Sequence, residues 1–199
     1  MHIDTKNDLA WFKKSCFDEK LVQSLKKIKL IICDIDGTLT DGTVYTGQES
    51  EGGRCFSTQD GFITKPALQS GLHIALVSGK ENLSTKIRGA ILGIPEDMCI
   101  GGKGKEKITV IKELQGKTGT TIEQTLIFGD DFLDANTKFQ GAAVGFYACP
   151  QNTPFYLQKI ADLVVPAPGG TRAFRLLLDL ILFLNKKHFA QELIEEALR

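Results

Sequence analysis

Two pairs of carboxylates follow short apolar runs in this sequence. Asp34 and Asp36 close the run "LIICDID" (30–36), and Asp130 and Asp131 close "TLIFGDD" (125–131). Carboxylates that gather in one place raise one another's pKa unless a cation lies among them. Oxygen ligands with no His or Cys nearby favour Mg²⁺, which commonly joins one or two carboxylates to a substrate phosphate. The sequence therefore predicts a magnesium site.

Other residues of this set are suited to phosphoryl transfer. The run "LHIALVSGK" (72–80) ends in Ser78, Gly79 and Lys80, and Lys107 closes "GGKGKEK" (101–107). A carboxylate can attack phosphorus and form an aspartyl-phosphate. A lysine stabilises the transferred charge, and a hydroxyl with backbone N–H groups holds phosphate oxygens.

The apolar runs alternate with segments of helical periodicity, which indicates an α/β protein. We expect strands at 29–35, 72–79, 97–101, 125–130, 142–147 and 162–167, and helices at 82–92, 106–116, 131–140 and 152–161. The repeating pattern predicts a Rossmann-like, mostly parallel sheet flanked by helices. Ligands of such sheets bind at the carboxyl ends of the strands, where these polar residues lie.

The chain is expected to form a single domain over 1–199, with its core at about 29–184. A helix at 6–28 and a helical tail at 171–199 bracket this core, and 171–184 is apolar nearly all round, which requires burial on more than one side. The segment 43–58 has two strand-like arms around a Gly-rich turn and predicts a β-hairpin inserted after the first strand.

Composition excludes several classes of protein. The 199 residues carry 24 basic and 24 acidic side chains, so no net charge favours nucleic acid or membranes. The longest apolar stretch is too short to span a bilayer. Five cysteines with wide spacing and no CxxC argue against a disulfide framework or a structural zinc site. We expect a cytoplasmic protein.

The motifs resemble those of the haloacid dehalogenase superfamily. "DIDGTLTDG" (34–42), "LVSGK" (76–80), Lys107 and "GDDFLD" (129–134) occur in that family's order. "TDGTVY", "FSTQDG" (56–61) and "PGGTRAFRLLLDLIL" (168–182) are similar to the 3-deoxy-D-manno-octulosonate 8-phosphate phosphatases within it. No long insert separates the motifs, so the chain resembles the capless members.

The resemblance implies a role for each matching residue. Asp34 is then the nucleophile, and Asp36 the general acid/base that also gives its backbone carbonyl to Mg²⁺. Asp130 is the third metal ligand, supported by Asp131, and Lys107 pairs with the nucleophile. Lys103 and Lys105 lie close enough to leave that lysine open. Asp134 is either a first-turn helix carboxylate or a further residue behind the site.

Substrate contacts are implied in the same way. Ser78, Gly79 and Lys80 would bind phosphate, and Asp60, Gly61 and Arg175 would contact the sugar. Two departures concern the sugar: Lys80 stands where the subfamily commonly has Arg, and "GGTRAFRL" (169–176) differs from the subfamily's usual GGRGAVRE.

Three hypotheses of function follow. The first is a Mg²⁺-dependent phosphatase of an acidic sugar phosphate, most of all 3-deoxy-D-manno-octulosonate 8-phosphate. As in the family members that it resembles, it would act as a homotetramer in which the hairpin of one subunit completes the active site of its neighbour. A nine-carbon, sialic-type sugar 9-phosphate is the alternative substrate. The other alternative is a non-catalytic tetramerising domain that serves a sugar cytidylyltransferase.

Overall fold

A six-stranded parallel sheet forms the centre of the protein in this computed structural model, which describes residues 5–44, 53–80, 83–102 and 106–199. The strand order is β3-β2-β1-β4-β5-β6. The strands are β1 (Leu30–Cys33), β2 (His73–Val77), β3 (Cys99–Ile100), β4 (Thr125–Phe128), β5 (Phe146–Pro150) and β6 (Leu163–Val165). All neighbours pair in parallel, so the predicted Rossmann-like α/β fold is confirmed.

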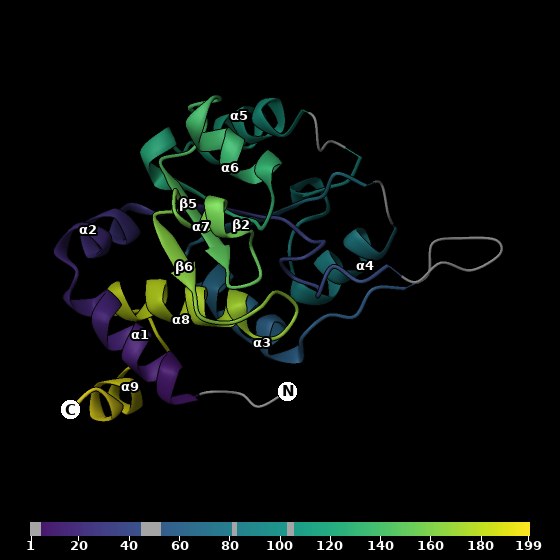
Figure 1. Cartoon of the computed structure of the whole chain (residues 1–199). Helices are drawn as coiled ribbons and strands as arrows, with labels where there is room; N and C mark the ends of the chain where they lie inside the picture. The colour runs from purple at the N-terminus through teal and green to yellow at the C-terminus, as the bar shows by residue number, and fades with distance from the viewer. Residues whose placement is uncertain (1–4, 45–52, 81–82, 103–105) are drawn as a thin grey trace.

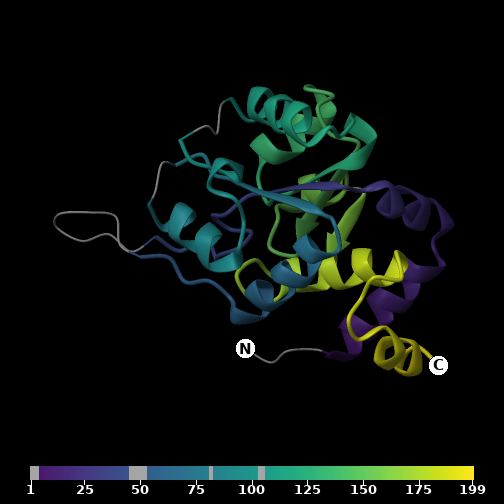
Figure 2. The same ribbon diagram turned by 180° about the vertical axis from the view of Figure 1, so that it is seen from behind.

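Helices cover both faces of the sheet. They are α1 (Thr5–Phe17), α2 (Glu19–Lys27), α3 (Thr58–Gln69), α4 (Leu83–Leu92), α5 (Lys107–Thr118), α6 (Phe132–Phe139), α7 (Phe155–Gln158), α8 (Ala173–Leu184) and α9 (Gln191–Ala197). Figures 1 and 2 show α5 and α6 on one side of the sheet and α1, α3 and α8 on the other. Strands covered on both faces are mostly apolar, as β1 is throughout and β4 is after Thr125.

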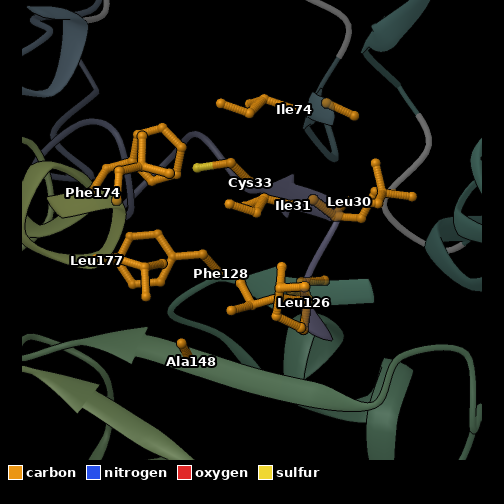
Figure 3. Close-up of a cluster of buried hydrophobic side chains, with 14 of the residues drawn as sticks. Leu30, Ile31, Cys33, Ile74, Leu126, Phe128, Ala148, Phe174 and Leu177 are labelled. Carbon is orange, nitrogen blue, oxygen red and sulfur yellow. The ribbon is translucent and has the colours of Figure 1, made fainter. Parts of the chain in front are cut away.

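The most apolar helix, α8, is buried within the monomer. Its side chains pack against the sheet, where Phe174 stacks on Phe128 with ring centroids 5.9 Å apart (Figure 3). Seven of its residues are buried: Ala173, Phe174, Leu177, Leu178, Leu180, Ile181 and Leu182. Among the described helices, none has the length and hydrophobicity of a membrane span.

The predicted fifth strand was placed too early. The strand expected at 142–147 runs instead over Phe146–Pro150. The residues before it form a loop, in which Ala142 has φ +42° and the Gly145 N–H donates to the carbonyl of Ile122. Ala143 and Val144 are buried in this loop rather than in the sheet.

Two helix predictions also need correction. The helix expected at 6–28 is divided at Asp18, whose side chain accepts a hydrogen bond from Leu21 N at 3.0 Å and so begins α2 as a separate helix. The helix expected at 152–161 shortens to Phe155–Gln158.

The predicted hairpin at 43–58 lies partly outside the described residues, because 45–52 are not described. The described flanks, 43–44 and 53–57, contain no strand, and Thr58 already belongs to α3. The hairpin stays a prediction.

Candidate active site

Asp34 and Asp130 lie at the same edge of the sheet because their strands are neighbours. Cys33, the last residue of β1, is in register with Phe128, the last residue of β4. The ladder continues one step further, with Asp34 N donating to the carbonyl of Phe128 at 2.9 Å. The expected convergence of polar residues at the strand ends is therefore present for these two carboxylates.

Lys107 connects the carboxylates. Its Nζ lies 2.8 Å from Asp34 Oδ1 and 2.6 Å from Asp134 Oδ1, and its side chain is only 5% exposed. Lys107 is the first residue of α5, so the helix start fixes its direction. Lys103 and Lys105 lie outside the described residues.

Three carboxylates form a cluster that suits a cation. Oxygens of Asp34, Asp130 and Asp134 all lie within 4.8 Å of one another. Asp134 was not among the predicted metal ligands. Asp134 lies in the first turn of α6, where its Oδ2 accepts a hydrogen bond from Asp131 N at 3.3 Å. An acidic residue at this position is also common in ordinary helix capping, so the sequence left the role of Asp134 open.

The electrostatics of the cluster show a deficit of positive charge. Burial and the charge of Asp134 raise the pKa of Asp34 to about 8, against the lowering effect of Lys107. Burial raises the pKa of Asp130 to about 6, although Thr38 donates a hydrogen bond to it. Burial alone would lower the pKa of Lys107, but Asp134 and Asp34 outweigh it and raise the pKa. An all-oxygen donor set with unneutralised charge fits a hard divalent cation.

The loop after β1 is built around one carbonyl. Ile35 O accepts hydrogen bonds from the backbone N–H groups of Thr38, Leu39 and Thr40 and from the Thr40 hydroxyl. The turn brings the Thr38 hydroxyl to 2.9 Å from Asp130 Oδ1. The "GTLT" sequence thereby ties the loop of β1 to the loop of β4.

Glycines allow the loops to approach the carboxylates. Gly37 has φ +89°, and a Cβ there would overlap the carboxylate of Asp130. A Cβ at Gly129 would overlap the carboxylate of Asp134. Both positions require glycine because the acidic side chains occupy the space.

A second loop closes over the first from the carboxyl-terminal part of the chain. Gly170 N donates to Thr38 O at 3.1 Å, and Asn152 Nδ2 donates to Gly37 O at 2.9 Å. Asn152 also accepts from Gly169 N at 2.7 Å. The "PGG" segment (168–170) therefore packs directly on the "DGT" turn (36–38).

Asp36 lies apart from the acidic cluster. Its carboxylate pairs with Arg54, whose Nε is 2.5 Å from Oδ1 and whose Nη2 is 2.8 Å from Oδ2. Ser78 Oγ lies 3.4 Å from Asp36 Oδ2. Arg54 was not predicted from the sequence, because nothing near it in "GGRCF" (52–56) distinguishes it from a surface arginine.

The second predicted motif is placed beside Asp36. Ser78 is buried at the end of β2, and its Oγ accepts from Lys80 N at 3.2 Å. Gly79 and Lys80 are exposed. This arrangement brings a hydroxyl and two accessible residues to the edge that carries Asp34, and phosphate binding by them stays a prediction.

Asp131 lies at the start of α6 as a capping residue. Its exposed side chain accepts from Phe132 N at 2.6 Å. The capping box with Asp134 fixes the turn between the two acidic residues that face the cluster, Asp130 and Asp134. Asp131 thus orients Asp134 through its backbone N–H, and its predicted supporting role in the site stays a prediction.

Asp60, Gly61 and Arg175 contact other residues than the acidic cluster. Asp60 is 2% exposed, and its Oδ1 accepts from the backbone N–H of Arg175 at 2.8 Å, which caps the start of α8. Burial raises the pKa of Asp60 to about 6, partly opposed by that hydrogen bond. The Arg175 side chain pairs with Asp179 at 2.6 Å, and Gly61 lies against Arg88. These contacts position α3 and α8; the predicted sugar contacts stay a prediction.

Comparison with known proteins identifies the relatives of this site. No family model matches the chain. The 3-deoxy-D-manno-octulosonate 8-phosphate phosphatase KdsC of Haemophilus influenzae is 34% identical over 160 residues, which are 80% of this chain and 86% of that protein.

Two solved structures have the same fold. The cobalt-bound deoxy-D-mannose-octulosonate 8-phosphate phosphatase (YrbI) of Haemophilus influenzae has a TM-score of 0.75 and 33% identity, over 82% of this chain and 92% of that one. The 3-deoxy-D-manno-octulosonate 8-phosphate phosphatase of Moraxella catarrhalis, in complex with a magnesium ion, a phosphate ion and a KDO molecule, has a TM-score of 0.77 and 27% identity, over 92% and 99% of the two chains.

Sequence similarity over four fifths of the chain, the shared fold and the acidic cluster agree with one another. The chain therefore belongs to the haloacid dehalogenase superfamily, in the family of the KdsC phosphatases, and is a phosphoric monoester hydrolase.

Proposed function

We propose that this enzyme hydrolyses 3-deoxy-D-manno-octulosonate 8-phosphate with Mg²⁺, through an aspartyl-phosphate on Asp34. The observation that carries the proposal is the contact of Lys107 with both Asp34 and Asp134, beside Asp130. A buried lysine held by two carboxylates orients Asp34 and places positive charge where a phosphoryl group would be transferred.

In the first step, an Asp34 oxygen attacks the phosphorus atom. The bond between phosphorus and the sugar oxygen breaks, and Asp36 gives a proton to that oxygen, so that the free sugar leaves. Lys107 stabilises the negative charge of the transferred group. Because Asp34 is anchored by its backbone to β4 and by its side chain to Lys107, its carboxylate needs to move little before it attacks.

In the second step, water attacks the phosphorus of the aspartyl-phosphate. Asp36 takes the proton from this water, the bond between phosphorus and the Asp34 oxygen breaks, and inorganic phosphate is released. Asp36 is thereby returned to its protonated form for the next turnover. Ser78, Gly79 and Lys80 hold the phosphate oxygens through both steps.

Asp34, Asp130 and the backbone carbonyl of Asp36 would hold the cation, with Asp134 next to them. When bound, Mg²⁺ neutralises the carboxylates and the phosphate and lowers the electrostatic barrier to attack by one anion on another. The donor set of this chain fits that ion because all its ligand atoms are oxygens.

The relatives support the choice of substrate. Each of the three matches described above acts, by its name, on the 8-phosphate of an eight-carbon sugar acid, and one of the solved structures holds KDO together with magnesium and phosphate. We propose the same substrate class for this chain, with Lys80 in place of the subfamily's usual Arg.

A homotetramer is part of the proposal. In the described residues the chain has no cap over the acidic cluster, so another element must limit the access of water. Exposed aromatic side chains such as Phe62, Phe155 and Phe189 supply apolar surface for subunit contacts. The predicted hairpin segment 43–58 is the element proposed to join the subunits. Its deletion should dissociate or unfold the oligomer; a monodisperse, fully active tetramer after this deletion would contradict that role.

The experiment that tests the function measures phosphate release from 3-deoxy-D-manno-octulosonate 8-phosphate and from a nine-carbon sialic-type sugar 9-phosphate, with Mg²⁺ and with chelator. We expect preference for the eight-carbon substrate, loss of activity with chelator and no turnover by Asp34→Asn. Preference for the nine-carbon substrate would reassign the sugar, and retained turnover by Asp34→Asn would exclude the covalent mechanism.

A further inference from the structure

We propose that Arg54 is the positioning residue for Asp36 and sets the geometry of its proton transfer. The inference rests on the proposed function, in which Asp36 protonates the leaving sugar oxygen. Arg54 does not touch the acidic cluster, and its effect on catalysis passes through Asp36.

The pairing between Arg54 and Asp36 fixes an orientation. Nε and Nη2 of Arg54 meet the two different oxygens of Asp36, at 2.5 Å and 2.8 Å. A planar guanidinium that binds both oxygens side by side sets the plane of the carboxylate, which a single lysine ammonium cannot do.

The guanidinium itself is held firmly. Its third nitrogen, Nη1, donates to Ser84 Oγ at 3.0 Å, at the start of α4. The Arg54 side chain is 7% exposed, whereas that of Asp36 is 31% exposed. The cation is therefore a buried support, and the carboxylate keeps an accessible side for the substrate.

Among the described residues, no other cation forms an ion pair with Asp36. Lys107 contacts Asp34 and Asp134, and Asp36 lies outside the cluster formed by Asp34, Asp130 and Asp134. Without Arg54, the described part of the chain leaves the Asp36 carboxylate one side-chain hydrogen bond. Ser78 Oγ forms it, at 3.4 Å from Oδ2, and contacts this oxygen only. The two aspartates of the motif thus use two separate cations, and loss of Arg54 should loosen Asp36 alone.

This difference can be measured through the leaving group. p-Nitrophenolate leaves without protonation, whereas a sugar alkoxide needs a proton from Asp36. The value of kcat/KM reports on the steps up to formation of the aspartyl-phosphate. For Arg54→Met, we expect kcat/KM for 3-deoxy-D-manno-octulosonate 8-phosphate to fall at least about tenfold further than kcat/KM for p-nitrophenyl phosphate, as part of the 10²–10⁴-fold typical of general acids. Arg54→Lys should give an intermediate loss, because it keeps the charge and loses the fork.

Arg172 supplies a matched control. It forms a similarly buried, two-pronged pair with Asp8, at 2.9 Å and 3.0 Å, with 10% of its side chain exposed. Arg172→Met should lower stability to a comparable degree and leave the ratio of the two kcat/KM values unchanged.

A double-mutant cycle gives the decisive test. Asp36→Asn should show the same dependence on leaving group, and addition of Arg54→Met to it should cost no further activity, because both changes remove one function. Equal losses on both substrates with Arg54→Met, or additive losses in the double variant, would overturn the inference. If the wild type turns over neither substrate, the proposed function is overturned instead. If Asp36→Asn shows the expected dependence on leaving group but Arg54→Met keeps the wild-type kcat/KM on both substrates, only the role of Arg54 is refuted.

Discussion

Gly37 and Asp130 are packed so closely that the Asp130 carboxylate fills the place of a side chain at position 37. Two loops, one after β1 and one after β4, meet at this contact. The carboxylate cluster therefore depends on a glycine that itself has no chemical function.

The first prediction concerns this contact. Gly37→Ala should displace Asp130, because the new Cβ would overlap its carboxylate, and it should also strain a backbone with φ +89°. We expect the free energy of unfolding to fall by more than about 1 kcal/mol and phosphate release to be nearly lost. Denaturant unfolding and a phosphatase assay measure the two effects.

Gly71 is the control for the backbone component. It has φ +93°, and apart from its two chain neighbours no described residue has an atom within 4 Å of the place that a Cβ would take, so Gly71→Ala introduces strain without displacing a carboxylate. Similar losses of activity in both variants would show that the Gly37 contact has no special role.

The second prediction concerns Lys107. Lys107→Met leaves Asp34 and Asp134 buried without their common partner, and removal of one side of a buried ion pair typically costs about 3–5 kcal/mol. Activity should be abolished, and the metal-free protein should lose stability as measured by urea unfolding. Lys138, whose pair with Asp162 is partly exposed, is the comparison, since Lys138→Met should cost about 1 kcal/mol or less.

The third prediction concerns pH. The pKa of Asp34 is raised to about 8 in the folded protein, so the folded state keeps a proton that the unfolded chain loses near pH 4. The folded state then binds more protons, and the free energy of unfolding of the metal-free protein should decrease as pH rises from about 4 to about 8. Asp34→Asn should weaken this decrease.

Thermal unfolding in chelator at pH 5 and pH 8 tests the pH prediction. Asp130, with a pKa of about 6, contributes in the same direction at the lower end of the range, so the mutant should retain part of the slope. Added Mg²⁺ should stabilise the protein more at pH 8 than at pH 5, because a larger share of the carboxylates is already ionised there and binding releases fewer protons. Parallel curves for wild type and Asp34→Asn would contradict the assigned cause.

The fourth prediction separates structure from substrate binding at Asp60. Its carboxylate caps the start of α8 from a different helix, so Asp60→Ala should destabilise the fold by about 1–2 kcal/mol, as loss of a cap does. Asp60→Asn keeps an acceptor and should cost less. If KM for the sugar phosphate rises in Asp60→Asn while stability is unchanged, Asp60 contacts the substrate as the family resemblance implies.

The sequence by itself determined the parallel α/β fold and the main residues of the acidic edge. Apolar runs ending in Asp34 and Asp130 are local signals, and neighbouring parallel strands bring such ends together by geometry alone. For the lysine of the site, the sequence left Lys103, Lys105 and Lys107 open, and the structure places Lys107 on Asp34. Residues 142–145 were assigned wrongly to a strand, because a short apolar run also occurs in a loop whose central residues, here Ala143 and Val144, are buried.

Only the tertiary structure decided which side chains are partners. Three contacts show this. Arg54 pairs with Asp36 across 18 positions of the sequence, and Lys107 contacts Asp134 across 27 positions. Asp60 caps α8 at Arg175, 115 positions away. Local sequence does not encode such contacts, because they depend on how helices and loops pack on the sheet. The sequence therefore determined which chemical groups are present at this edge, and packing decided which cation each carboxylate binds.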